Sequence, residues 1–357
     1  MWSRLPLGAL TLSAVALTSS GCLNKMVDSV VLKRVIPSGQ QISDTRQACA
    51  MGTSLSFAVG GITKKTPEMS LSLSEATAGV CTEKLSWEAE IDQLIAGRMV
   101  AGPAKAERLT DAAIRARRYH AASAAQFERA WTALDRQMGP LGDSECPKIK
   151  EHEEIVYVVG MVAGALALIH DRKAEGANNI PLDRLGKVGR AAKCLDTEKF
   201  WHLGPALEAA AWATIPGSGP EGVDPWQVLA EAADKGDSSG VRVARSLQAK
   251  IASNAGNDQL VGEALDKYAA SMKNTPRNQD WALLDQYSYD IALHEADKLW
   301  VKETGHRAEV LSSVPVEPVL EPLGDDPFAT DPFAAPTPNE SEETTETSDD
   351  SDAKETP

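Results

Sequence analysis

The chain has 357 residues, of which 43% are hydrophobic and 24% are charged, values typical of a globular protein. Its formal net charge of −15 argues against nucleic-acid binding through neutralised phosphates. Most of that charge belongs to residues 321–357, which hold 12 acidic residues and one basic residue. Residues 1–320 are therefore nearly neutral. No stretch reaches the roughly 18–20 consecutive apolar residues expected of a membrane span.

The first 22 residues have the pattern of a bacterial export signal. Arg4 supplies a short positive region, and Leu5–Leu17 is uncharged and rich in leucine and alanine. Small residues then precede Cys22, which resembles the site where bacterial lipoproteins are cleaved and acylated; Ser19 departs from the leucine preferred there. The alternative is an ordinary signal peptide followed by a chance cysteine. We expect residues 1–21 to be a lipoprotein signal peptide. We expect a lipid on Cys22 to anchor the chain to a membrane of the cell envelope, the outer membrane facing the periplasm being favoured over the inner one.

Four further cysteines are expected in an oxidising compartment. An even number there predicts two disulfides, with three possible connectivities. Sequential pairing closes the shortest loops, so we favour Cys49 with Cys81 and Cys146 with Cys194. A metal site is the competing interpretation. Because no Cys-x-x-Cys occurs, we expect no metal.

Most of residues 23–303 are predicted to be helical, because apolar residues recur at three- and four-residue spacing. One such stripe begins at Trp87 and another at Phe127. Residues 155–169 carry no charge, and at about 1.5 Å per residue they span roughly 22 Å, short of a roughly 30 Å hydrocarbon core. We expect this segment to be a helix buried on all sides. Residues 69–74 alternate like a strand, but the stretch is isolated and is left unassigned.

Helix start signals follow one another regularly in the second half. Predicted helices begin near residues 205, 225, 238 and 257, so that alternate starts lie 33 and 32 residues apart. A period of about 33–34 residues holding two helices is typical of tetratricopeptide (TPR) repeats. The residue pattern of that repeat is only partly present. We therefore expect an all-α, TPR-like helical-repeat domain over residues 22–304.

The composition changes after residue 304. Residues 314–322 are spaced by proline, Asp-Pro-Phe occurs at 326–328 and 331–333, and the remainder is acidic and rich in threonine and serine. Such a segment buries too little apolar surface to offset the entropy of ordering it. We expect residues 305–357 to be a disordered tail.

Catalytic motifs are not found in the sequence. His152 and His294 each lack the second histidine of a His-Glu-x-x-His zinc site, and no Gly-x-Ser-x-Gly nucleophile motif occurs. The six histidines are scattered, and we interpret each as a surface or core-edge residue. We therefore expect neither enzymatic activity nor a cofactor, and a function in binding.

Aromatic residues gather around a Gly-Pro break in the second half. Phe200-Trp201-His202-Leu203-Gly204-Pro205 is followed by Trp212 and Trp226. Aromatic side chains at helix starts can line a groove or a pore, which makes Trp201, His202, Trp212 and Trp226 the candidate binding groove. Core packing between repeats is the alternative, and the one we favour.

The layout resembles the T component of TRAP transporters, a family of periplasmic lipoproteins built from helical repeats. The likeness rests on a short helix directly after the lipidated cysteine, on the segment 200–207, and on the break at 215–221 before the helix at 226–233. It covers roughly residues 22–300. The extra cysteines, the acidic tail and the weak repeat pattern depart from the family.

This resemblance implies a non-enzymatic, lipid-anchored accessory protein. Its partner would be the periplasmic solute-binding protein of a TRAP system for organic-acid uptake, and its subunits can form a homo-oligomer. Its helical body would enclose a cavity for an organic, hydrophobic acid. The alternative is a TPR-like lipoprotein scaffold for envelope protein assembly.

Overall fold

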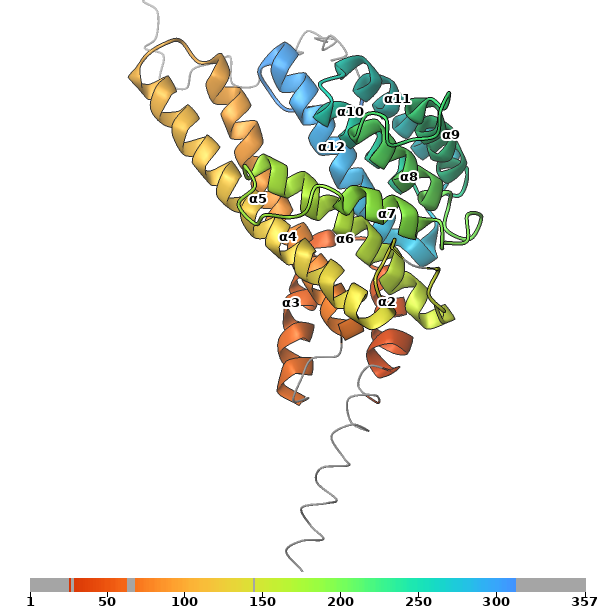
Figure 1. The fold of residues 1–357 in the computed structure, drawn as a ribbon. Helices are drawn as coiled ribbons and strands as arrows, with labels where there is room; N and C mark the ends of the chain where they lie inside the picture. The colour runs from red at the N-terminus through yellow and green to blue at the C-terminus, as the bar shows by residue number, and fades with distance from the viewer. Residues whose placement is uncertain (1–25, 27–28, 63–67, 144, 313–357) are drawn as a thin grey trace, which may run out of the picture. The chain divides into compact units, whose positions relative to one another are not determined.

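The computed structural model describes residues 26, 29–62, 68–143 and 145–312. Within these ranges the chain is all-helical and contains no strand, which confirms the predicted all-α class (Figure 1), whereas the TPR-like repeat stays a prediction. The signal peptide, the proposed lipid site at Cys22 and residues 313–357 of the expected tail lie outside the described residues.

The N-terminal half is built around a long helical hairpin. A π-helical turn, Val31–Val35, leads into α2 (Ile36–Gln40) and α3 (Thr45–Ile62), and the hairpin follows as α4 (Glu68–Arg98) and α5 (Pro103–Met138). The α4 and α5 helices lie side by side along their length (Figure 1). The alternating stretch at residues 69–74 is the first part of α4, and five of its six residues are buried: Met69, Ser70, Ser72, Leu73 and Ser74.

The apolar segment forms α6 (Glu154–Lys173), which follows a short 3₁₀ turn, Glu151–Glu153, and packs against α4 and α5. Among the described residues, the segment 151–173 alone is long and apolar enough to cross a membrane. Of its apolar 18-residue stretch, 72% is buried inside the protein. Glycines let the helices approach closely, since a Cβ at Gly164 would lie 2.2 Å from the Trp131 ring. The expected helix buried on all sides is confirmed.

The C-terminal half consists of shorter helices that pack in sequence. They are α7 (Arg184–Ala192), α8 (Leu203–Thr214), α9 (Pro225–Ser238), α10 (Val243–Asn254) and α11 (Asp258–Asn274). The expected start at 238 is wrong: the Ser238 hydroxyl donates to the Asp234 carbonyl inside α9, and α10 begins five residues later. Gly240 makes the turn with φ +75°, where a Cβ would lie 2.3 Å from the Pro276 carbonyl oxygen.

The last helix joins the two halves. A 3₁₀ turn, Gln279–Trp281, leads into α12 (Ala282–Thr304), which contacts α10 and α11 on one side and α3 and α4 on the other (Figure 1). Beyond it, the Ala308 amide donates to Asp297 at 2.9 Å, and Leu311 packs on the body. The last helix therefore ends at Thr304, where the helical domain was expected to end, and residues 305–312 of the expected tail pack against the body without forming a helix.

Two disulfides tie neighbouring segments together. The structure pairs Cys49 with Cys81, linking α3 to α4, and Cys146 with Cys194, linking the loop after α5 to the end of α7. The Cα atoms of the two pairs lie 5.6 Å and 5.4 Å apart. This is the sequential pairing favoured by loop length.

Candidate functional site

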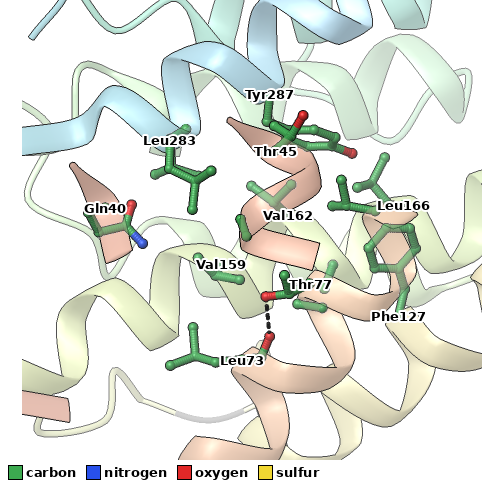
Figure 2. Close-up of a pocket in the computed structure, with 15 residues that line it drawn as sticks. Gln40, Thr45, Leu73, Thr77, Phe127, Val159, Val162, Leu166, Leu283 and Tyr287 are labelled. Carbon is green, nitrogen blue, oxygen red and sulfur yellow. Dashed lines mark hydrogen bonds between the residues drawn. The ribbon is translucent and has the colours of Figure 1, made fainter. Parts of the chain in front are cut away.

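An apolar cavity of about 90 Å³ lies among α2, α3, α4, α5, α6 and α12. Figure 2 shows the side chains around it, with Gln40 and Leu283 on one side and Phe127 and Leu166 on the other. The wall is almost entirely aliphatic and aromatic, because these helices turn valine, leucine and alanine positions toward one another. A space of this kind favours an apolar ligand over water.

Gln40 is the polar feature of one end of the cavity. Its Oε1 atom is buried and has no hydrogen-bond partner among the described residues. The same side chain also lines an open groove of about 680 Å³, to which Ile36, His152, Lys199 and Trp281 contribute. Gln40 therefore lies between the apolar cavity and a solvent-accessible groove.

Behind the opposite wall lies a buried network of charged and polar side chains, here called the histidine network. The Tyr287 ring lines the cavity, and its hydroxyl donates to Glu83, which is fully buried. Phe127 lines the cavity too, and its ring centroid lies 5.7 Å from that of His170. The members come from five helices: Glu83, Trp87 and Glu90 on α4; His120 on α5; His170 and Lys173 on α6; Lys250 on α10; and Tyr287, His294, Glu295 and Lys298 on α12.

Helical spacing explains why α4 contributes three of these side chains. Glu83, Trp87 and Glu90 follow one another at intervals of four and three residues, which places them on one face of the helix. The Trp87 ring stacks on His294 at a centroid distance of 5.0 Å, and the Lys250 ammonium lies 5.2 Å from the Trp87 ring. The Trp87 ring thus lies between Glu83 and Glu90 along this face of α4. It contacts α12 through His294 and α10 through Lys250.

Glu83 is the centre of one end of the network. Its Oε1 accepts hydrogen bonds from His170 Nε2 and from Lys250 Nζ, each at 2.9 Å. Burial by itself raises the pKa of Glu83, but Lys250 and His170 outweigh this effect and hold the pKa well below its usual range. Glu83 is therefore a carboxylate at neutral pH. Burial and the adjacent Glu83 charge raise the pKa of Tyr287 well above its usual value, so its phenol stays protonated.

Glu90 is the centre of the other end, closer to solvent. Its Oε1 contacts Lys173 Nζ at 2.6 Å and His120 Nε2 at 3.0 Å, and its Oε2 contacts His294 Nε2 at 2.8 Å. Burial raises the pKa of Glu90, but Lys173 and the two histidines lower it far more. An open polar pocket of about 470 Å³ reaches this end and is lined by Glu90, His120 and Lys173.

The three buried histidines have depressed basicity. Burial lowers the pKa of His170 to about 4, even though Glu83 favours the charged ring. Burial also lowers the pKa of His120 and of His294, against the effect of Glu90. Burial therefore favours the neutral form of all three rings. In the part of the chain that the structure describes, no group of three His, Cys, Asp or Glu side chains is arranged to bind a metal ion.

The candidate groove residues lie in different places. Trp201 is 5% exposed in the largest core cluster, with its ring centroid 4.6 Å from that of Trp281. His202 directly precedes α8 and has φ +56°. Its Nε2 atom lies 3.3 Å from Glu198 Oε1. Trp212 and Trp226 are half-buried against a second cluster. The structure thus brings Trp212 and Trp226 together without Trp201, and a role for these residues in binding stays a prediction.

Sequence reasoning missed the histidine network. The prediction that each histidine lies at the surface or core edge is wrong for His120, His170 and His294, which are at most 4% exposed. A signal was present, because Glu83 and Glu90 flank Trp87 on a face that is otherwise apolar. The partners, however, come from helices up to 204 residues away, as in the Tyr287–Glu83 bond.

Comparison of the chain with protein-family models, with curated proteins and with solved structures finds no match.

Proposed function

We propose that the chain is a non-enzymatic binding protein that holds a short apolar group, carrying one polar end, in the cavity beside Gln40. The single observation that supports this proposal is the cavity, in which an almost wholly apolar wall meets one unpartnered amide oxygen. Ligand sites in proteins commonly combine such a wall with a few polar groups that fix orientation.

The size of the cavity limits the ligand. An apolar cavity of roughly 150 Å³ is known to bind benzene, so about 90 Å³ admits a chain of a few carbon atoms. The polar end would remain near Gln40 and the adjoining groove, where Lys199 and His152 supply positive or hydrogen-bonding groups. A short-chain acid or alcohol meets both requirements.

The wider setting of this proposal is the cell envelope. A lipid on Cys22 would hold the body at the membrane, and the periplasmic solute-binding protein of a TRAP system would be the partner, as the resemblance implies. Two disulfides suit an oxidising compartment. The successive packing of α7 to α11 is compatible with degenerate TPR-like repeats. A homo-oligomer is what the resemblance implies.

A non-enzymatic role agrees with the chemistry of the histidine network. Glu83 is 0% exposed, and its carboxylate is bound by three side chains. Acid–base catalysis requires a group within hydrogen-bond reach of the substrate. The cavity wall places Tyr287 and Phe127 between a ligand in the apolar cavity and the Glu83–His170 end of the network.

The test fills the cavity with a larger side chain. Val162→Phe should weaken binding of butanoate and of 1-butanol, measured by calorimetry or ligand-observed NMR, at least tenfold. Val228→Phe is the matched control: it enlarges another half-buried valine, on α9, away from the cavity. Gln40→Met should weaken binding of 1-butanol while sparing a wholly apolar probe of similar length such as butane.

Failure of all these probes to bind the unaltered protein would contradict the proposed ligand class. The scaffold alternative predicts that Val162→Phe and Val228→Phe leave capture of envelope proteins equally intact. Recovery of a solute-binding protein from the periplasm would favour the TRAP setting.

A further inference from the structure

A continuous chain of four side chains crosses the buried interior, from Glu83 through His170 and His120 to Glu90. Glu83 Oε1 lies 2.9 Å from His170 Nε2, and His120 Nε2 lies 3.0 Å from Glu90 Oε1. Between them the two imidazoles meet through their Nδ1 atoms at 2.7 Å. Each of the three contacts is within hydrogen-bond distance, so each requires one proton.

The protons available do not suffice when both rings are neutral. A neutral imidazole carries one N–H, and two rings carry two. Neither glutamate supplies the third, because Glu83 accepts from Lys250 and Tyr287, and Glu90 accepts from Lys173. With only two protons, one contact would bring two lone pairs together. The three short contacts thus require one additional proton on the pair of rings.

We propose that His120 and His170 together form a binding site for one proton, which the two rings share. When the site is filled, His170 donates through Nε2 to Glu83, His120 donates through Nε2 to Glu90, and the shared proton lies between the two Nδ1 atoms. When it is empty, both rings are neutral and one of the three contacts lengthens. No bond other than N–H forms or breaks.

The surroundings set the pH at which the site fills. The charged and titratable groups that face the pair are Glu83 and Glu90 from α4, Lys173 from α6, Lys250 from α10, and Tyr287, His294, Glu295 and Lys298 from α12. The three carboxylates balance the three ammonium groups. Because burial then opposes an added charge, the shared proton binds below the ordinary histidine range near 6.5.

Solvent reaches the site from one side. Both rings are at most 2% exposed, but His120 lines the open polar pocket beside Glu90 and Lys173, whereas His170 does not line that pocket and packs against Phe127. A proton therefore enters at His120 and reaches His170 along the Nδ1–Nδ1 contact. Its arrival adds one positive charge next to the Phe127 and Tyr287 side chains that line the apolar cavity.

The experiment is a histidine NMR titration of the full chain labelled with ¹⁵N in its imidazole rings. Only six histidines contribute signals, and single His→Gln variants assign them. Between pH 7.5 and 3.5, the ring nitrogens of His120 and His170 should shift together, with one common midpoint below 6.5 and a total uptake of one proton. His120→Gln should abolish this transition at His170, whereas His152→Gln, at a half-buried position outside the histidine network, should leave the midpoint unchanged.

Three outcomes would overturn the proposal. The two rings could titrate at separate midpoints, both could stay neutral while the amide spectrum shows an intact fold, or His170 could titrate unchanged in His120→Gln. The decisive measurement is made on the unaltered protein, so a variant that fails to fold does not remove the test.

Discussion

Two buried clusters of charge differ in the kind of cation they use. The arginine cluster comprises Arg242, Asp285 and Arg277 and joins α10 to α12. Arg242 Nη1 bonds both carboxylate oxygens of Asp285, at 3.1 Å and 3.0 Å, and its other nitrogens donate to Ser271 and Thr275. The histidine network instead combines lysines with three imidazoles.

This difference separates a fixed charge from an adjustable one. A guanidinium keeps its charge throughout the physiological range, and its planar set of donors suits a carboxylate and nearby carbonyls. An imidazole changes its charge near neutral pH and can both donate and accept. The arginine cluster therefore holds two helices together at any ordinary pH. The histidine network holds five helices in a way that depends on protons.

The largest effect is expected from breaking the arginine cluster. Arg242→Met should lower the free energy of unfolding by about 3–5 kcal/mol, because it leaves Asp285 and two carbonyls short of donors in the interior. Urea denaturation measures this loss. Arg277→Met is the matched control: the Arg277 side chain is 26% exposed, so its removal should cost about 1 kcal/mol. Equal losses would show that Arg242 is not the main partner of Asp285.

The next effect is the acid sensitivity of the histidine network. The pKa of His170 is lowered by burial to about 4, whereas the unfolded chain has an ordinary value near 6.5. As the pH falls below 6.5, the unfolded state binds a proton first, so stability decreases until the pH reaches about 4. His170 alone accounts for at most about 3–4 kcal/mol of this loss, at roughly 1.4 kcal/mol per pKa unit. The depressed carboxyl pKa values of Glu83 and Glu90 add a further loss below pH 4.5.

Urea denaturation at pH 7.0, 6.0 and 5.0 measures this slope. His170→Gln should flatten it, whereas His152→Gln should not. Stability that stays constant or rises as the pH falls from 7 to 5 would contradict the assignment of the buried histidines as the acid-sensitive groups.

The sequence predicts the helical class and the disulfide pairing because both depend on short-range features. Residues 155–169 are uniformly apolar, and the cysteines allow only three pairings, of which one has the shortest loops. The predicted start of α10 is wrong because the Ser238 hydroxyl donates to the Asp234 carbonyl within α9 and does not cap the next helix. The turn between α9 and α10 lies instead at Gly240, which packs closely against the Pro276 carbonyl. His170 is harder still. It directly follows the apolar segment, yet only the folded arrangement of α4, α5 and α12 supplies the partners that make its burial possible.

The smallest effect concerns an ion pair outside both clusters, between Arg307 and Glu88. The shortest contact is 2.6 Å, but the side chains are 39% and 62% exposed, so water screens their attraction. Arg307→Ala should lower the free energy of unfolding by only about 0.2–1 kcal/mol, near the typical value for surface pairs. Glu88→Ala and the double variant complete a mutant cycle that isolates the pair from the second contact of Arg307, at 3.4 Å to Asp297. A coupling energy above about 2 kcal/mol would contradict this expectation and show that the pair stabilises the fold as strongly as a buried ion pair. It would mean that the segment after α12 fixes α4 to α12 as firmly as the interior does.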